Sequence, residues 1–296
     1  MRPPELRQRA RERPLLLDGG LGSMLIAAGL EAGRAPEWWN IEHPDRVQAV
    51  HGAYVEAGSE VIHTNTFGGN PLRLSAAGLA GRYREVNAAA VATARAACRR
   101  RSLVAGDVGP TGHMLPPLGT ATVEELREAF REQVEVLADA GVDLISVETM
   151  SDLREAQAAV DAARATGLAV HVSMTFERRR RGTFTIMGDP LVASLLALEA
   201  AGADAVGFNC SVAPPEMVDM VREAAPSVRA PLSAQPNAGQ PRVTPSGVTY
   251  DASAETFARD LVAMVDAGAA LVGGCCGTTP RFIREARKAL EAARRL

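Results

Sequence analysis

The sequence has 296 residues, of which 47% are hydrophobic and 23% are charged, and its formal net charge at pH 7 is −3. A chain of this size can bury a large core, and it lacks the positive charge that nucleic-acid binding usually needs. Its longest apolar stretches are strand-sized, well short of the roughly 20 residues of a membrane-spanning helix. The charged N-terminus has no apolar segment of a secretory signal. We therefore expect a cytoplasmic protein that binds neither nucleic acid nor membrane.

Short apolar stretches alternate with helical patterns along the whole chain. Strands are predicted at residues 14–18, 60–64, 103–107, 143–148, 168–174, 204–209, 229–236 and 270–274, each followed by a helix. Before four of these strands an Ala-Gly pair predicts a helix end, with a glycine in the left-handed conformation. These glycines are Gly58, Gly141, Gly202 and Gly268. Eight such units predict an α/β fold, a single-domain (β/α)8 TIM barrel at residues 14–296 after an N-terminal extension at residues 1–13. An open doubly wound sheet is the alternative.

The unusual residues follow the carboxyl ends of the predicted strands, where such barrels place their catalytic groups. The segments concerned are DGGLG at 18–22, TNTFGGN at 64–70, GDVGPTG at 106–112, ETM at 148–150, NC at 209–210, PNAG at 236–239 and GGCCG at 273–277. Because all of these segments leave the same end of the barrel, they are expected to form one site.

Three of the four cysteines lie in these segments: Cys210 after one strand, Cys275 and Cys276 after another. Thiolates are soft ligands that favour zinc, and three protein ligands leave a fourth position open for a substrate. Adjacent cysteines bind one ion only where the chain turns, which the flanking glycines permit. Two other interpretations stay open, namely buried apolar cysteines and a vicinal redox disulfide. Cys98 is expected to be a buried apolar residue.

The seven segments, in this order, resemble those of the homocysteine S-methyltransferase family. The resemblance runs from about residue 14 to the C-terminus and includes Thr278-Thr279-Pro280 after the paired cysteines. It implies a (β/α)8 barrel in which Cys210, Cys275 and Cys276 are the Zn²⁺ ligands and the catalytic groups. The implied reaction is an SN2 methyl transfer to the zinc-bound thiolate of homocysteine, which forms methionine. Zinc would supply the activation, because a free thiol with a pKa of about 8.5 is mostly protonated at neutral pH.

The resemblance also implies a set of substrate-binding residues. Asp18 and Glu148 would hold the ammonium group of homocysteine, and backbone N–H groups at 20–22 would lie near its carboxylate. Asn237 matches a position that occupies the open zinc site when substrate is absent. The ordinary alternatives are a helix cap for Asp18, an ion pair for Glu148 and a turn for Asn237. The full set is Asp18, Gly20, Leu21, Gly22, Thr66, Glu148 and Asn237.

The methyl donor is less well defined by the sequence. The segment 106–112 and Trp39-Asn40-Ile41 followed by Pro44 resemble the homocysteine module of cobalamin-dependent methionine synthase. This implies a methylcorrinoid donor such as methylcobalamin, loaded from methyl-folate and carried by a corrinoid protein in trans. Trp38 and Trp39 favour a different donor. They are predicted to bind the methyl donor, because an aromatic face binds a small onium group such as that of betaine or S-methylmethionine. The alternative is that the two indoles simply pack against the barrel.

Other features leave further interpretations open. The run Arg178–Arg181 lies after the fifth predicted strand and is either a solvated loop or a docking site for an acidic partner. His63 and His171 fall within strands and are expected in the core or at the rim. A different class of function is a non-catalytic zinc-binding barrel that acts as a scaffold or sensor. The two acidic residues Asp18 and Glu148 favour an enzyme over a scaffold or sensor, because they are the predicted substrate-binding residues.

Overall fold

The structure, a computed structural model, describes residues 1–31, 33–244 and 247–296. Eight parallel strands form one sheet in the order β1-β12-β9-β8-β5-β4-β3-β2. A parallel bridge between Leu17 and Val61 joins β1 to β2, the two ends of that order. The sheet therefore closes into a barrel. The predicted single-domain (β/α)8 fold is confirmed, and the open doubly wound sheet is not observed in the described residues.

All eight predicted strands are present within a few residues of their expected ranges. Their residues are nearly all buried, as in parallel strands that are covered on both faces. The strands are β1 (Leu15–Leu16), β2 (Val61–His63), β3 (Leu103–Val108), β4 (Leu144–Met150), β5 (Ala169–Met174), β8 (Ala205–Asn209), β9 (Leu232–Gln235) and β12 (Ala269–Val272).

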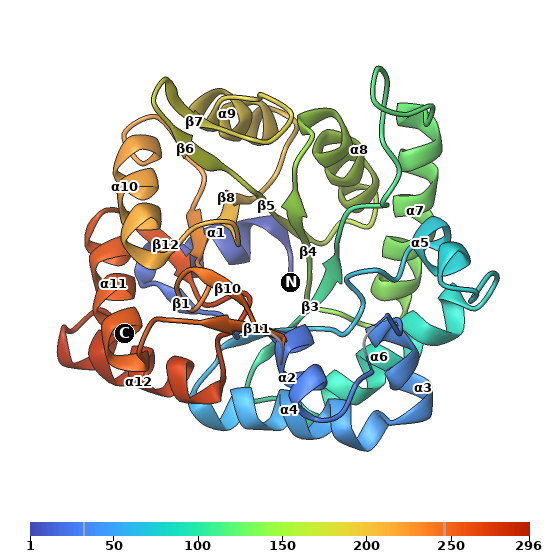
Figure 1. The fold of residues 1–296 in the computed structure, drawn as a ribbon, viewed down its shortest axis with the longest axis horizontal. Coiled ribbons are helices and arrows are strands. Elements are labelled where there is room, and N and C mark those ends of the chain that lie inside the picture. The colour runs from blue at the N-terminus through green and yellow to red at the C-terminus, as the bar shows by residue number, and fades with distance from the viewer. Residues whose placement is uncertain (32, 245–246) are drawn as a thin grey trace.

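Helices follow the strands and surround the barrel as an outer ring (Figure 1). The ring consists of α4 (Pro44–Ala57), α6 (Tyr83–Cys98), α7 (Val123–Asp139), α8 (Leu153–Arg164), α9 (Leu191–Ala200), α10 (Pro214–Ala224), α11 (Ala254–Asp266) and α12 (Pro280–Ala292). It closes where α12 packs against α4. The predicted helix ends are confirmed, since Gly58, Gly141, Gly202 and Gly268 have φ values of 104°, 92°, 97° and 116°.

Helix α1 (Pro3–Glu12) covers the amino-terminal end of the barrel. Its Leu6 and Ala10 are buried in a small apolar cluster with residues from the starts of the strands. Arg7 forms an ion pair with Asp204 at 2.9 Å. The residues predicted as an N-terminal extension thus form a helix that packs against the barrel, at the end opposite to the loops that follow the strands.

Shorter elements fill the loops at the carboxyl ends of the strands. After β1 come α2 (Leu21–Ala27), η1 (Pro36–Trp38) and α3 (Trp39–Glu42), and after β2 comes α5 (Pro71–Ala76). Two antiparallel hairpins, β6 (Glu177–Arg179) with β7 (Gly182–Phe184) and β10 (Pro241–Thr244) with β11 (Gly247–Tyr250), follow β5 and β9. None of the helices within the described ranges is long and apolar enough to cross a membrane.

Candidate active site

A cavity of about 460 Å³ opens among the loops at the carboxyl ends of the strands. This volume is within the range of small-molecule sites, roughly 300–1,000 Å³. The loops after β1, β2, β4, β8 and β12 all contribute to its wall. Eight of the residues predicted for the site line it, namely Asp18, Gly20, Leu21, Gly22, Glu148, Cys210, Cys275 and Cys276.

The thiols of Cys210, Cys275 and Cys276 form one compact group in this wall. Their Sγ atoms all lie within 4.8 Å of one another, and those of Cys210 and Cys276 are 4.0 Å apart. Two thiolates bound to a tetrahedral zinc at about 2.3 Å would be separated by about 3.8 Å. The observed spacing therefore suits three ligands of one tetrahedral ion.

Unusual backbone conformations bring these thiols together. Cys210 and Ser211 adopt left-handed φ values of 58° and 61°, which are uncommon for residues other than glycine. Gly277, directly after the paired cysteines, has a φ of 78°, and a Cβ atom there would lie 2.2 Å from the ring of Tyr250. The predicted turn after Cys276 is thus present, and it depends on a glycine.

Hydrogen bonds tie the loop that carries Cys275 and Cys276 to its neighbours. The N–H of Cys275 donates to the carbonyl of Pro236 at 2.8 Å, and the N–H of Ala238 donates to the carbonyl of Cys276 at 2.9 Å. The Thr278 hydroxyl donates to the carbonyl of Cys275 at 2.6 Å. The paired cysteines are therefore fixed before any ligand binds.

The three thiols share negative charge unevenly. Hydrogen bonds from Cys275 and Cys276 lower the pKa of Cys210 to about 3. The hydrogen bonds to Cys210 raise the pKa of Cys276 to about 11 and that of Cys275 well above its ordinary value. The three neighbouring thiols thus differ in acidity. A metal ion held by Cys210, Cys275 and Cys276 would favour the thiolate form of all three.

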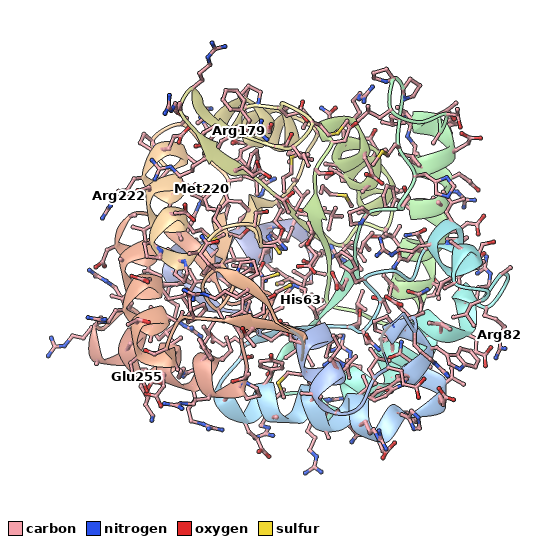
Figure 2. All side chains as sticks on the ribbon, viewed as in Figure 1. His63, Arg82, Arg179, Met220, Arg222 and Glu255 are labelled. Carbon is pink, nitrogen blue, oxygen red and sulfur yellow. The ribbon has the colours of Figure 1, made fainter. Side chains whose placement is uncertain are left out.

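His63, labelled near the centre of the view in Figure 2, contacts Asp18 inside the barrel. The backbone N–H of His63 donates to Oδ2 of Asp18 at 2.9 Å, and its Nδ1 lies 2.7 Å from Oδ1. Burial lowers the pKa of His63, but the charge and hydrogen bond of Asp18 outweigh it and raise the pKa to about 10. His63 is therefore an imidazolium that compensates the charge of Asp18 at neutral pH.

The hydrogen bonds continue from His63 across the barrel interior. Nε2 of His63 lies 3.1 Å from Oγ of Ser146, which is 2.9 Å from Nδ1 of His171. Nε2 of His171 is 2.6 Å from Oγ of Ser233. Burial lowers the pKa of His171 to about 3, so this ring is neutral. Both histidines were predicted in the core or at the rim, and His63 occupies both places, since it is buried and lines the cavity.

Glu148 lies at the end of β4, close to the thiols. Asn209 connects the two, because its amide nitrogen is 3.3 Å from Oε2 of Glu148 and 3.8 Å from Sγ of Cys275. Burial and the charge of Asp18 raise the pKa of Glu148 to about 7, against the opposing effect of His63. A positive ligand near Glu148 would favour its ionised form.

Asp107, at the end of β3, is another acid of the cavity, and the sequence did not single it out. It is 5% exposed, and among the described residues none donates a hydrogen bond to its Oδ1. Burial and the charge of Glu148 raise the pKa of Asp107 well above its ordinary value. The sequence marks its segment, GDVGPTG at 106–112, as a whole, and this segment is the signal that points to the side chain.

Other predicted residues lie around the cavity rather than in its wall. The Thr66 hydroxyl donates to the backbone carbonyl of Asp107 at 2.7 Å and so supports the end of β3. Asn237 is buried and hydrogen-bonded to the Cys210 thiol. The amide of Gly20 donates to the Thr278 hydroxyl at 3.0 Å, and Leu21 and Gly22 line the cavity.

The two tryptophans are not brought to the cavity. Trp39 is 3% exposed, with its ring against His43 at 4.9 Å, and Arg46 lies over its face. The guanidinium of Arg82 lies 4.7 Å from the centre of the Trp38 ring. Neither belongs to the cavity wall in the described part of the chain. This placement gives no support to their predicted role in donor binding.

Residues between α2 and α5 complete the wall, and sequence patterns did not reveal them. Arg34 and Glu37 come from the long connection after β1, and Arg73 comes from α5. Oε1 of Glu37 accepts the N–H of Gly68 at 2.6 Å. Because these residues do not lie at strand ends, the barrel rule that located the other groups could not identify them.

The chain matches relatives along most of its length. The family model described as homocysteine S-methyltransferase matches residues 15–290. A methionine synthase of Mycobacterium tuberculosis (strain ATCC 25618 / H37Rv) is 34% identical over 303 residues, with 96% of this chain and 25% of the relative covered. A methionine synthase of Mycobacterium leprae (strain TN) is 33% identical, with 97% and 25% covered. The chain thus spans about a quarter of the length of these two relatives.

Solved structures agree with this assignment. The metallated form of the homocysteine methyltransferase MmuM from Escherichia coli is 27% identical and superposes with a TM-score of 0.78. The match covers 93% of this chain and 96% of that protein. The resemblance inferred from the seven sequence segments is confirmed. The chain is a methyltransferase that belongs to the homocysteine S-methyltransferase family.

Proposed function

We propose that the chain transfers a methyl group to the thiol of homocysteine and so forms methionine, with Zn²⁺ held by Cys210, Cys275 and Cys276. The observation that carries the proposal is the convergence of three thiols in the wall of a cavity that also contains carboxylates. A scaffold or sensor would need the thiols but not the acids. We place the protein in the cytoplasm, where thiols stay reduced.

The donor set and its geometry fit zinc. Three soft thiol ligands with this spacing form three corners of a tetrahedron and leave the fourth for a substrate. When bound, zinc stabilises the thiolate form of a coordinated thiol, which is the nucleophilic form. Asn237 supports the site through its hydrogen bond to Cys210, and Asn209 contacts Cys275.

The chain's own residues orient the substrate. The acids Asp18 and Glu148 provide negative charge for the ammonium group, and the backbone at Leu21 and Gly22 faces the carboxylate. With both ends of the amino acid held, the sulfur points toward the methyl donor. The thiolate sulfur then attacks the methyl carbon in line with the bond to the leaving atom of the donor, which departs with the electron pair.

For the donor we propose a methylcorrinoid presented by a partner protein. Support comes from the 34% identity to a protein named methionine synthase and from the position of the tryptophans. The paired indoles were the sequence argument for a small onium donor, and neither lines the cavity in the described residues. S-methylmethionine and betaine are the competing donors.

The direct test is methionine formation from homocysteine by the zinc-loaded protein. Methylcobalamin, S-methylmethionine, betaine and methyl-folate are supplied separately, with Cys275→Ala as the control. Turnover with methylcobalamin that is lost in the variant is the expected result. Turnover with S-methylmethionine or betaine alone would overturn the corrinoid proposal, and turnover that survives in Cys275→Ala would overturn the zinc proposal.

A further inference from the structure

One part of the cavity wall does not come from the ends of strands. It consists of residues 33–37, in the connection between α2 and α3, and we call it the outer segment. The loop after β2 contributes Asn65 and Gly68 to the same wall. The described residues of 28–35 form neither a helix nor a strand. Side-chain contacts are therefore needed to hold the outer segment in place.

Three buried side chains fasten the outer segment to the loop after β2. Oε1 of Glu37 accepts the N–H of Gly68 at 2.6 Å. Nδ2 of Asn65 donates to the carbonyl of Pro36 at 2.7 Å and to Oδ1 of Asn40 at 3.0 Å. Nδ2 of Asn40 in turn donates to the carbonyl of Asn65 at 2.8 Å. Because Glu37, Asn65 and Asn40 are at most 5% exposed, these hydrogen bonds are shielded from water and strengthened by it.

Glu37 is the unusual member of this set, because it is an acid. Burial raises its pKa more than hydrogen bonds from backbone N–H groups and the charge of Arg73 lower it. Gly68 lets both groups approach, since a Cβ atom there would lie 2.9 Å from Oε1 of Glu37 and 3.1 Å from the Arg73 side chain. The guanidinium of Arg73 lies 5.5 Å from the centre of the Phe67 ring. Glu37 and Arg73 thus meet at Gly68, and Phe67, Gly68 and Arg73 all line the cavity.

The loop that Glu37 holds lies across the barrel from Cys210. Gly68 follows β2 and Cys210 follows β8, and the strands between them run in the order β2-β3-β4-β5-β8. In a closed barrel of eight strands, four steps lead to the opposite side. A substrate sulfur held beside Cys210 therefore faces the loop after β2 across the cavity. The methyl group has to be presented in the space between them.

We propose that Glu37 is a positioning residue for the methyl donor. Its hydrogen bond to Gly68 holds the outer segment where the donor methyl comes into line with the substrate sulfur. This role rests on the proposed function, because it concerns the second reactant of that reaction. Homocysteine itself is assigned to other segments, which carry Asp18 and Glu148. Small displacements matter here, since a misplacement of about 1 Å can reduce a rate on the order of 100-fold.

The test compares the two reactants on the zinc-loaded full chain. Glu37→Ala removes the acceptor of the Gly68 N–H. With saturating homocysteine and methylcobalamin as the varied donor, its kcat/KM for the donor is expected to fall about 10- to 100-fold. The Kd of homocysteine, measured by calorimetry without any donor, should stay within about 2-fold of the wild-type value. If the wild type uses another of the four donors of the direct test, that donor replaces methylcobalamin.

Two further variants separate positioning from stability. Glu37→Gln keeps an oxygen that can accept the Gly68 N–H and should recover most of the lost kcat/KM. Glu155→Ala is the matched control, because Glu155 is also 5% exposed and its Oε1 accepts the N–H of Thr111 at 2.9 Å, outside the cavity wall. It should lower the melting temperature as Glu37→Ala does, since both leave a buried N–H without its acceptor, but keep the donor kinetics. Asn65→Ser, which removes the bond to Pro36, serves if Glu37→Ala does not fold.

Three results would overturn the inference. The first is unchanged donor kinetics in Glu37→Ala. The second is an equal loss of homocysteine affinity, which would make Glu37 a structural residue. The third is a Gln variant as impaired as the Ala variant, which would exclude the hydrogen bond as the cause. A wild type that uses none of the four donors would instead overturn the proposed function, and this outcome is seen before any variant is made.

Discussion

His63 and Asp18 join the ends of the first two strands by two hydrogen bonds, 2.9 Å from the backbone N–H and 2.7 Å from ring Nδ1. The strands themselves are joined by the bridge between Leu17 and Val61 and by a hydrogen bond of 2.7 Å from the N–H of Glu60 to the carbonyl of Leu16. A buried ion pair therefore reinforces the barrel where its sheet closes. It also affects the charge of the cavity, because His63 compensates one of the four acids that line it in the described residues.

This pair makes stability depend on pH on the alkaline side. The pKa of His63 is about 10 in the folded protein, against 6.5 for an ordinary histidine side chain, so the folded state binds more protons between these limits. The stabilisation is full below about pH 6.5 and is lost as the pH rises toward 10. In urea unfolding at several pH values, His63→Gln should show a smaller decline in this window than the wild type. Parallel declines would contradict the assigned charge of His63.

A second histidine should control stability on the acid side. His51 is fully buried in α4, and burial lowers its pKa from 6.5 to about 4. The unfolded state then binds the proton first, so stability is complete above about pH 6.5 and falls as the pH drops toward 4. His171, with a pKa of about 3, adds to the same loss. His51→Leu removes one of these groups, and its stability should fall less between pH 6.5 and 4. An acid profile identical to that of the wild type would refute this prediction.

The barrel could be predicted because its signals are local. Each strand is a short apolar stretch. Several helices end at a glycine with a positive φ, such as Gly58 and Gly268, and the Ala-Gly pair in the sequence predicts this end. The same rule predicted that the three cysteines converge, since strand ends converge in a barrel, whereas their role as zinc ligands came from the family resemblance. Cys210 and Cys276 are 66 positions apart in the chain and 4.0 Å apart in space.

The remaining site residues depend on partners that no local pattern reveals. Asp107 differs from an ordinary strand-end acid only because, among the described residues, its Oδ1 has no partner. The sequence around Trp38 and Trp39 is the same whether their rings stack on a ligand or on an arginine. In the structure Arg82 lies over Trp38 and Arg46 lies over Trp39. Thr66 is predicted to bind substrate, and its hydroxyl donates to the backbone carbonyl of Asp107, a contact that no local pattern predicts.

Removal of one thiol should abolish tight metal binding. Cys210→Ala leaves two ligands, and the zinc content of the purified protein is expected to fall from about one ion per chain to well below half. Cys98→Ala is the control, because Cys98 is buried in α6 and burial raises its pKa to about 11. It should keep its zinc and lose only about 1 kcal/mol of stability. Metal analysis after dialysis against a chelator measures both. Equal zinc in the two variants would show that the ion is held elsewhere.

The turn after the paired cysteines should not tolerate a side chain. Gly277→Ala places a Cβ atom 2.2 Å from the Tyr250 ring at a φ of 78°. The strain and the displaced ring should cost about 1–3 kcal/mol and weaken zinc binding. Gly52→Ala is the matched control, since a Cβ at this position in α4 meets nothing within 4 Å. It should be stabilising by about 0.5–1 kcal/mol. A Gly277 variant with normal melting temperature and zinc content would show that the loop adapts.

A mutation at the amino-terminal end of the barrel should lower stability without changing catalysis at the carboxyl-terminal end. Leu6 of α1 is fully buried at the amino-terminal end, where it packs with the starts of the strands. Leu6→Ala should therefore reduce the free energy of unfolding by about 2–5 kcal/mol. Because the cavity lies at the other end, kcat and the KM for homocysteine of the folded variant should stay at wild-type values. Arg11→Ala, an exposed change in the same helix, should alter stability by no more than about 0.5 kcal/mol. Urea unfolding and steady-state kinetics on the same samples test this, and a changed KM in Leu6→Ala would mean that the two ends of the barrel are coupled.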